Sequence, residues 1–250
     1  MTPSLTHASA EPFWTGDVSS MPACPTMSAD VTCDLAIVGG GFTGLWSALK
    51  ARERSPGARI VVLEGGTCGQ AGSGRTGGFC APSISHGVGN ALDRHPREAG
   101  TLIRLGRENL VEYQRDLEHY EMDAGFELCG KLNVASTPWQ AEGLKAMARN
   151  YARFGIDCTL LSGAALKEKL DSPAYSAGLF EPNYALIHPA RTVSELRRVC
   201  IELGIAIFEN SKVTGLSRDG SEIALETSEA RVRAGKVVLA TNAAVPLLKR

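Results

Sequence analysis

Apolar and polar positions form blocks between residues 34 and 64, and these blocks predict a strand, a helix and a second strand. Leu35–Val38 is continuously apolar, which is typical of a strand that is buried on both faces. A helix is expected from Leu45 to about Arg54, and the Ser-Pro-Gly sequence that follows it favours a stop. Ile60–Leu63 predicts a second buried strand, so the unit ends on an acidic residue, Glu64.

The middle of the chain carries a different pattern, in which helical and alternating segments follow one another. Helical spacing of the apolar residues predicts helices over residues 96–122, Pro138–Phe154 and Ala164–Leu170. Apolar residues alternate with polar or small ones over Phe126–Val134, which predicts a half-buried antiparallel strand. We therefore expect an inserted second domain with its own antiparallel sheet over about residues 91–185.

The last part of the chain is expected to return to the first domain. Pro189 is suited to the first turn of a helix that runs to Leu203, and Ile205–Phe208 predicts a strand that continues through Val213. Asp219-Gly220 indicates a hairpin between strands near 213–217 and 222–227, and Arg231–Ala240 predicts the last strand. The first domain is thus predicted to comprise residues 31–90 and 186–250.

Residues 1–30 are rich in Ser, Thr, Ala and Pro and predict an extended arm. Phe13 and Trp14 are the residues expected to pin this arm onto the body of the protein, and a disordered tail is the alternative. The segment lacks the basic start and the apolar core of a secretory signal peptide.

The turn between the first strand and the first helix reads Gly39-Gly40-Gly41-Phe42-Thr43-Gly44 and fits the pattern G-x-G-x-x-G. The first glycine permits a tight turn, the second lets the backbone approach a pyrophosphate, and the third lets the helix pack close to the strand. The N–H groups and the positive dipole end of the helix then face two phosphates. The motif in this context predicts a dinucleotide site, and an ordinary turn is the alternative.

Glu64 stands 20 residues beyond Gly44, at the end of the second strand. A carboxylate there accepts hydrogen bonds from the ribose hydroxyls of an adenosine and repels a 2′-phosphate, so NADP is disfavoured. The motif does not choose between FAD and NAD. The fold class that follows is α/β (α+β overall), with a Rossmann-like dinucleotide-binding domain and an inserted antiparallel-sheet domain.

A glycine-rich segment, Gly65–Gly78, follows the acidic residue instead of another helix and strand. Its bare N–H groups and the guanidinium of Arg75 suit a loop that wraps a flat or anionic ligand. A flexible surface loop without a ligand is the alternative, and Arg75 is equally suited to tie the loop internally.

Composition limits the function classes further. The 250-residue chain is 44% hydrophobic and carries 26 basic and 27 acidic side chains, so its net charge of −1 predicts neither a nucleic acid nor an anionic membrane as partner. No apolar run approaches the roughly 20 residues that span a bilayer. Seven cysteines without a C-x-x-C pair predict reduced thiols in the cytoplasm, and five scattered histidines predict no metal site.

Four stretches in this order resemble the flavin-dependent amine and D-amino acid oxidase family, which includes glycine, sarcosine and γ-glutamylputrescine oxidases. They are GGGFTG at Gly39, LEGG at Leu63, SGRTGG at Ser73 and LATN at Leu239, with a weaker fifth match from Ala185. The resemblance spans about residues 31–245. Members usually continue well beyond this length, so the chain is expected to be the N-terminal part of such an oxidase, truncated at its C-terminus.

The resemblance implies FAD as the cofactor. It also implies that residues 31–90 and 186–250 form the FAD-binding domain, that residues 91–185 form part of a substrate domain, and that the cofactor makes a set of contacts. The pyrophosphate would lie against Gly39, Gly41, Phe42, Thr43 and Gly44, with Glu64 and Gly65 at the adenosine ribose. The loop Ser73, Gly74, Arg75, Thr76, Gly77 and Gly78 would run along the phosphates and the isoalloxazine ring, Val213 would meet the adenine through its backbone, and Ala240 and Thr241 would close over the pyrophosphate.

The reaction that the resemblance implies is oxidation of a C–N bond in a small amine or amino acid. Hydride moves to flavin N5, the imine hydrolyses, and dioxygen typically reoxidises the flavin to give hydrogen peroxide. His188 is a candidate to hold the uncharged amine, and a loop histidine bonded to backbone is its alternative. Cys80 is expected to be a small core residue rather than a covalent flavin ligand or a redox thiol.

Two further functions stay open at this point. One is an NAD-dependent dehydrogenase, which the first motif fits equally well. The other is a catalytically incomplete FAD-binding fragment or subunit that needs a C-terminal partner chain.

Overall fold

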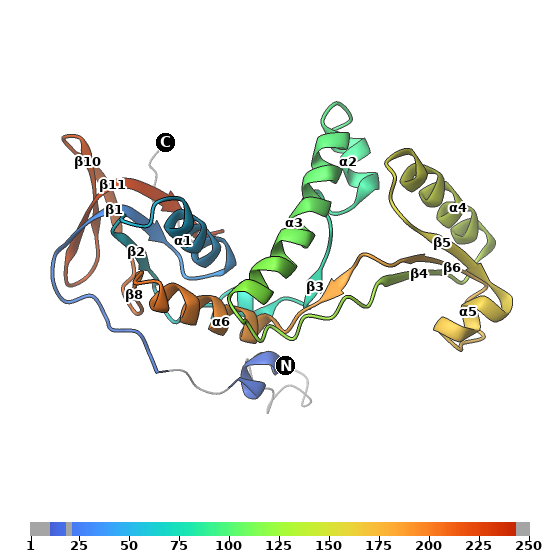
Figure 1. Ribbon diagram of the computed structural model, residues 1–250, viewed down its shortest axis with the longest axis horizontal. Coiled ribbons are helices and arrows are strands. Elements are labelled where there is room, and N and C mark those ends of the chain that lie inside the picture. The colour runs from blue at the N-terminus through green and yellow to red at the C-terminus, as the bar shows by residue number, and fades with distance from the viewer. Residues whose placement is uncertain (1–10, 19–21, 244–250) are drawn as a thin grey trace, which may run out of the picture. The chain divides into compact units, whose positions relative to one another are not determined.

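A computed structural model of the chain describes residues 11–18 and 22–243 (Figure 1). The ends of the predicted arm and of the predicted last segment therefore lie partly outside the described residues. The described residues divide into two compact units, the first within Met1–Gly77, Met122–Ala124 and His188–Arg250, and the second within Gly78–Glu121 and Gly125–Ile187. The assignment of these parts to a cofactor domain and a substrate domain stays a prediction.

The first unit is built on a six-stranded sheet in the order β8-β2-β1-β11-β10-β9. The strands are β1 (Val31–Val38), β2 (Ile60–Leu63), β8 (Ala206–Phe208), β9 (Gly215–Asp219), β10 (Glu222–Glu226) and β11 (Arg231–Leu239). β8, β2, β1 and β11 run parallel, and β10 and β9 add an antiparallel hairpin at one edge. The predicted strand–helix–strand unit and the predicted hairpin are confirmed.

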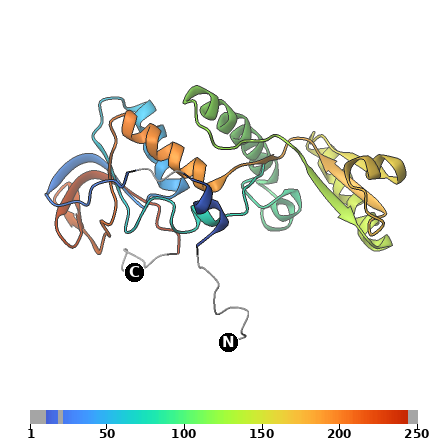
Figure 2. The same cartoon turned by 90° about the horizontal axis from the view of Figure 1, so that it is seen from below.

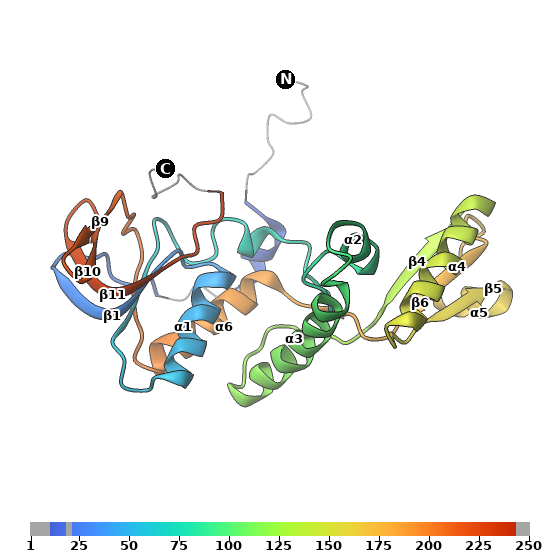
Figure 3. The ribbon, with the colours of Figure 1, turned by 90° about the horizontal axis from the view of Figure 1, so that it is seen from above.

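Two helices of this unit, α1 (Phe42–Arg54) and α6 (Pro189–Glu202), lie side by side (Figures 2 and 3). Ile37 of β1 and Val62 of β2 are fully buried, as are Ala36 and Leu63, whose side chains point to the opposite face. Both faces of the central strands are therefore covered, which explains why these strands are continuously apolar in the sequence. A short 3-10 helix, η2 (Phe13–Asp17), precedes the sheet, and η3 (Ser73–Arg75) lies in the glycine-rich segment.

The predicted continuation of the strand at 205–208 through Val213 is wrong. β8 ends at Phe208, and the chain then turns, with Asn210 at φ +50°. The N–H of Ser211 donates to the carbonyl of Glu64 and the N–H of Asn210 to the carbonyl of Gly66, at 2.8 Å each. These bonds hold residues 209–213 against the end of β2, so this segment does not continue β8 as a strand.

The second unit contains a three-stranded antiparallel sheet in the order β4-β6-β5, flanked by two helices (Figure 1). Its elements are α2 (Val88–Arg94), α3 (Ala99–His119), β4 (Lys131–Ala135), α4 (Pro138–Arg153), β5 (Thr159–Ser162), α5 (Gly163–Lys169) and β6 (Ala177–Glu181). A two-stranded antiparallel ribbon, β3 (Phe79–Cys80) with β7 (Ala185–Leu186), completes the unit. Its core includes Ile103, Leu144, Tyr151 and Leu179.

The predicted strand over Phe126–Val134 is only partly correct. The regular strand begins at Lys131, and before it only Glu127 forms an isolated bridge, to Leu186. Gly125 and Gly130 have positive φ values of +58° and +77°, which interrupt the extended backbone at both ends of the intervening segment. The helix predicted over 96–122 is likewise shorter, because α3 spans Ala99–His119.

The predicted arm contacts the body through only one of its two aromatic residues. Phe13 is 83% exposed, so the expectation that it is pinned is wrong. Trp14 donates from Nε1 to the carbonyl of Thr76 at 2.8 Å. In the part of the chain that the structure describes, no helix is both long and apolar enough to cross a lipid bilayer.

Candidate functional site

The glycine turn between β1 and α1 is closely packed by backbone and side-chain atoms. Gly39 has φ +114°, and a Cβ there would lie 2.5 Å from the carbonyl oxygen of Ala240. A Cβ on Gly41 would lie 2.7 Å from Oγ of Ser73, and one on Gly44 would lie 1.8 Å from the carbonyl oxygen of Gly39. A side chain at any of the three predicted positions would therefore displace its neighbours.

The first turn of α1 offers hydrogen-bond donors. Gly41 occupies the N-cap without a side-chain hydrogen bond, and the N–H of Phe42 donates to Oγ of Ser73 at 2.9 Å. Within residues 11–18 and 22–243, the N–H groups of Thr43 and Gly44 have no acceptor. These donors and the helix dipole favour an anionic group at this end of the helix.

The carboxylate of Glu64 lies beside the same turn. Its Oε2 accepts from the N–H of Gly40 at 2.7 Å, and its Oε1 accepts from the N–H of Gly66 at 2.8 Å. Each carboxylate oxygen has a second lone pair, so the pair of oxygens retains the capacity to accept from hydroxyl groups. The structure thus brings the predicted acid and the predicted glycine turn together.

The glycine-rich segment folds back onto the turn. The N–H of Gly69 donates to the carbonyl of Gly40 at 3.1 Å, and the N–H of Gly74 donates to the carbonyl of Gly69 at 2.9 Å. Nε of Arg75 donates to the carbonyl of Gln70 at 2.9 Å, so its guanidinium ties the loop internally while the residue stays exposed. Thr76 and Gly77 are exposed, and Gly78 has φ +78°.

The remaining predicted cofactor residues lie at the ends of neighbouring strands. Val38 and Leu239 are partners in the parallel β1–β11 pair, and the next residue, Ala240, donates its N–H to the carbonyl of Val38 at 2.8 Å. This pairing places Ala240 against Gly39, with Thr241 half-buried after it.

Val213 belongs to the segment that runs beside Gly65. A Cβ on Gly65 would lie 3.4 Å from Cβ of Lys212, the neighbour of Val213. The Val213 side chain is buried, while its backbone N–H and carbonyl form no hydrogen bond with any of the described residues. The edge of this backbone is consequently available to a ligand.

A buried ion pair adjoins the loop, and sequence reasoning missed it. Nε of Arg197 lies 3.5 Å from Oε1 of Glu209, and the two side chains are 7% and 3% exposed. The carboxylate of Glu209 also accepts the N–H groups of Cys24 and Cys68 at 2.8 Å each. The signal that could have found the pair is a charged residue within an apolar pattern in each element, at Arg197 in α6 and directly after β8 at Glu209.

A hollow of about 270 Å³ lies next to this ion pair. It is bordered by the glycine-rich segment, by α6 and by the residues that precede β1. Thr15 and Val18 line it from the N-terminal side, and Gly69 and Gly74 line it from the loop.

His188 has a structural role at the start of α6. Its Nδ1 accepts the N–H of Arg191 at 3.2 Å, and its ring lies edge-on to Trp14 with the centroids 5.0 Å apart. His188 is thus the N-cap of α6. The catalytic role predicted for His188 stays a hypothesis.

The seven cysteines are free thiols, of which Cys129 is exposed. Burial raises the pKa of Cys80 to about 11. Burial also raises the pKa of Cys68, and the nearby carboxylate of Glu209 raises it further. A thiolate nucleophile is therefore disfavoured at both positions. Among the described residues, no group of three His, Cys, Asp or Glu side chains is arranged to hold a metal ion.

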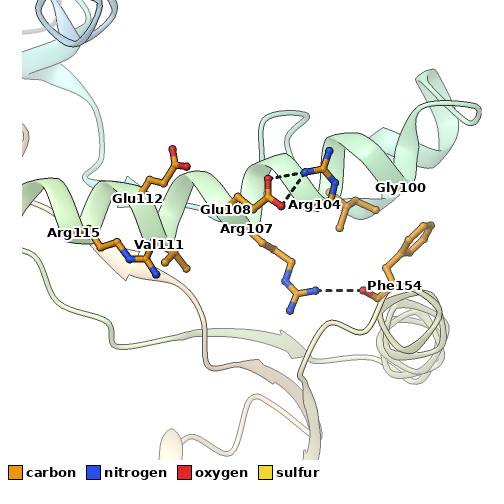
Figure 4. A pocket seen from close by; sticks show the side chains of 9 residues that line it. Gly100, Arg104, Arg107, Glu108, Val111, Glu112, Arg115 and Phe154 are labelled. Atoms are coloured by element: carbon orange, nitrogen blue, oxygen red, sulfur yellow. Dashed lines mark hydrogen bonds and ion pairs between the residues drawn. The ribbon is translucent and has the colours of Figure 1, made fainter. Parts of the chain in front are cut away.

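The second unit has a separate hollow of about 620 Å³ along α3 (Figure 4). Its rim carries both arginine and glutamate side chains. Nη1 of Arg104 lies 2.7 Å from Oε2 of Glu108, and Nη1 of Arg107 donates to the carbonyl of Phe154 at 3.4 Å. Exposed pairs of this kind are typical of a solvated helix face.

Comparisons with known proteins give a consistent result. The family model described as FAD dependent oxidoreductase matches residues 34–250. The chain is 28% identical over 229 residues to the probable oxidoreductase OrdL of Haemophilus influenzae, covering 90% of this chain and 52% of that protein. It is 29% identical over 225 residues to the gamma-glutamylputrescine oxidoreductase of Escherichia coli, covering 87% and 51%.

A solved structure shows a similar fold. The glycine oxidase of Geobacillus kaustophilus superposes with a TM-score of 0.74 at 20% identity, over 85% of this chain and 56% of that chain. The chain therefore spans about half the length of the curated relatives that it matches.

Proposed function

The chain belongs to the FAD dependent oxidoreductase family, and from this premise we propose that it oxidises the C–N bond of a small amine or amino acid. FAD is the cofactor of the family, so the NAD-dependent alternative is set aside. The observation that carries the proposal is the meeting of three elements in one unit. The donors at the start of α1, the carboxylate of Glu64 and the glycine-rich segment all join at Gly40 and its neighbours.

The residues present fit an FAD molecule. The three glycines whose Cβ positions are filled by neighbouring atoms would bring the backbone close to a pyrophosphate, and the N–H groups of Thr43 and Gly44 would donate to it. Glu64 would accept from the adenosine ribose, and the open backbone of Val213 would meet the adenine edge. The proposed cofactor residues are Gly39, Gly41, Phe42, Thr43, Gly44, Glu64, Gly65, Ser73, Gly74, Arg75, Thr76, Gly77, Gly78, Val213, Ala240 and Thr241.

When bound, FAD would supply the two-electron oxidation, accepting hydride at N5 from the carbon beside the nitrogen. The chain's own residues would hold the cofactor in place. The negative charge of Glu64 would repel a 2′-phosphate. Dioxygen is the proposed acceptor, with hydrogen peroxide as the second product.

The proposal extends to partners and location. Because the chain spans about half of its relatives' length, we propose that complete activity needs a polypeptide equivalent to their other half. A chain that binds FAD without turning over an amine is the corresponding alternative. All seven cysteines are free thiols, which supports a reducing compartment such as the cytoplasm.

The decisive experiment is the visible spectrum of the purified chain before and after incubation with FAD and removal of the excess. We expect a flavin spectrum in equimolar amount, and release of the flavin on acid precipitation, because Cys80 is not activated for a covalent bond. Protein that stays colourless and retains no added FAD would overturn the proposal. Anaerobic bleaching of the flavin by small amines and amino acids, with 2-hydroxy acids as controls, then tests the substrate class.

A further inference from the structure

The predicted arm precedes the stretch that the family model matches. Its described residues 11–18 and 22–27 nevertheless include contacts to the candidate cofactor loop. The arm contains η2 and the extended segment before β1. Two of its contacts with the rest of the first unit involve the glycine-rich segment.

The first contact is made by Trp14. Its indole N–H donates to the carbonyl of Thr76 at 2.8 Å, across 62 residues of sequence. The other side of the indole lies edge-on to the ring of His188, the N-cap of α6. Trp14 therefore holds the exposed end of the loop against the start of a helix.

The second contact is made through Glu209. Its Oε2 accepts the N–H of Cys24 in the arm, and its Oε1 accepts the N–H of Cys68 in the loop, at 2.8 Å each. Arg197 faces the same carboxylate and donates to the carbonyl of Pro22 and to Sγ of Cys24. One buried carboxylate thus joins the arm to the beginning of the loop.

The loop needs such ties because of its composition. Seven of its 14 residues are glycine, and glycine loses more conformational freedom on ordering than any other residue. If the loop becomes ordered only when the cofactor binds, the loss of its conformational entropy weakens binding. A loop that is already ordered in the apoprotein avoids this loss. Ser73 ties the inner side of the loop to the first residue of α1, and Gly69 ties it to the turn at Gly40. At the outer end, the carbonyl of Thr76 accepts the indole N–H of Trp14.

We propose that Trp14 is a positioning residue for the cofactor, which pre-orders the Ser73–Gly78 end of the loop and thereby sets the affinity for FAD. This inference rests on the proposed assignment of the loop to the flavin. It concerns a residue that lies outside the matched stretch of 34–250.

Two measurements on the full chain test the inference. Trypsin cleaves after Arg75, the only Lys or Arg between residues 65 and 78, and the carbonyl of the next residue accepts the indole N–H. Cleavage at this bond in the apoprotein, normalised to cleavage after exposed Arg218 in the β9–β10 hairpin, reports opening of the loop. Titration with FAD, followed by flavin fluorescence, reports affinity.

The variants are Trp14→Ala, Trp14→Phe and the matched control Trp139→Ala, which removes an exposed tryptophan from α4 in the second unit. For Trp14→Ala we expect cleavage after Arg75 to rise, and the Kd for FAD to weaken, by about fivefold to tenfold each, as the loss of one hydrogen bond and one ring contact implies. Trp14→Phe keeps an aromatic ring but lacks the N–H donor. Its cleavage after Arg75 and its Kd for FAD should therefore lie between those of the wild type and of Trp14→Ala. Trp139→Ala should match the wild type.

The bound flavin gives a further readout. A loop that is displaced at its flavin side should shift the visible absorption of bound FAD in Trp14→Ala, which a mere loss of global stability would not do. Trp14→Ala behaving as Trp139→Ala in either cleavage or affinity would overturn the inference while leaving FAD binding intact. A wild-type chain that binds no FAD would overturn the proposed function, and this inference with it.

Discussion

The carboxylate of Glu64 accepts a hydrogen bond from the backbone N–H of Gly40, with 2.7 Å between Oε2 and the nitrogen. The bond connects the end of β2 to the turn before α1, 24 residues earlier in the chain. It fixes the acid beside the proposed pyrophosphate site before any ligand is bound. The same carboxylate would repel a 2′-phosphate, which agrees with an FAD rather than an NADP protein.

Replacing Glu64 by Gln should weaken FAD binding by about tenfold or more. The amide of glutamine would turn one donor towards the N–H of Gly40 or Gly66, so one hydrogen bond is lost as well as the charge. Calorimetric titration with FAD measures the effect. The control is Glu53→Gln on α1, where an exposed pair with Lys50 is worth less than about 1 kcal/mol. Equal affinities in the two variants would contradict the role given to Glu64.

Replacing Gly44 by Ala should destabilise the first unit by about 3 kcal/mol or more, because the added Cβ would meet a backbone oxygen that cannot move freely. That oxygen, of Gly39, would lie 1.8 Å away. Urea unfolding measures the change. Gly57→Ala is the matched control, since a Cβ there meets nothing within 4 Å. Identical unfolding midpoints for both variants would show that the close packing of α1 on β1 is not required.

Removing one partner of the buried Arg197–Glu209 pair should cost about 3–5 kcal/mol, because an uncompensated charge stays in the interior. Glu209→Gln tests this by urea unfolding. The control is Glu108→Gln in the exposed Arg104–Glu108 pair, with an expected change under about 1 kcal/mol. The double variant Arg197→Met, Glu209→Gln removes both charges and keeps an acceptor oxygen for the N–H of Cys24 or Cys68, so it should recover part of the loss. A single variant as stable as the wild type would exclude a structural role for the pair.

The stability of the protein should fall as the pH rises above 9, in part because of Cys200. Burial raises the pKa of this thiol from an ordinary value of 9.0 to about 12, so the folded state keeps the proton that the unfolded state loses. The contribution of the Cys200 thiol to the free energy of unfolding is complete below pH 9 and is lost between pH 9 and about 12. The slope is about 1.4 kcal/mol per pH unit for one thiol.

Urea unfolding of the wild type and of Cys200→Ala over this pH range measures that slope. The variant should show a shallower decline, and the exposed-thiol control Cys129→Ala should follow the wild type. Parallel curves for the wild type and Cys200→Ala would mean that the thiol titrates alike in the folded and unfolded states.

His188 should prove to be a helix cap rather than a proton-transfer group. Because Nδ1 accepts the N–H of Arg191, His188→Ala should destabilise α6 by about 1 kcal/mol, whereas His188→Asn keeps an acceptor and should not. The pH dependence of anaerobic flavin reduction should be unchanged in His188→Asn. A displaced pH profile in that variant would restore the catalytic hypothesis.

Sequence patterns were sufficient for the parts of this protein that depend on local geometry. The spacing of Gly39, Gly41 and Gly44 between an apolar run and a helix predicted the turn, because steric demands on a backbone act over a few residues. The apolar periods likewise predicted α6 and the β9–β10 hairpin. They failed at residues 126–130 and 209–213, where glycines with positive φ or bonds to the end of β2 override local preference.

The contacts that make these segments one site come from the tertiary structure alone. Ser73 reaches Phe42 across 31 residues, Trp14 reaches Thr76 across 62, and Cys24 reaches Glu209 across 185. No periodic pattern encodes such partners, because they depend on the strand order β8-β2-β1-β11, which brings the ends of distant strands to one edge of the sheet. The sequence by itself therefore determined which residues suit a dinucleotide, whereas the order of the strands decided which of them meet.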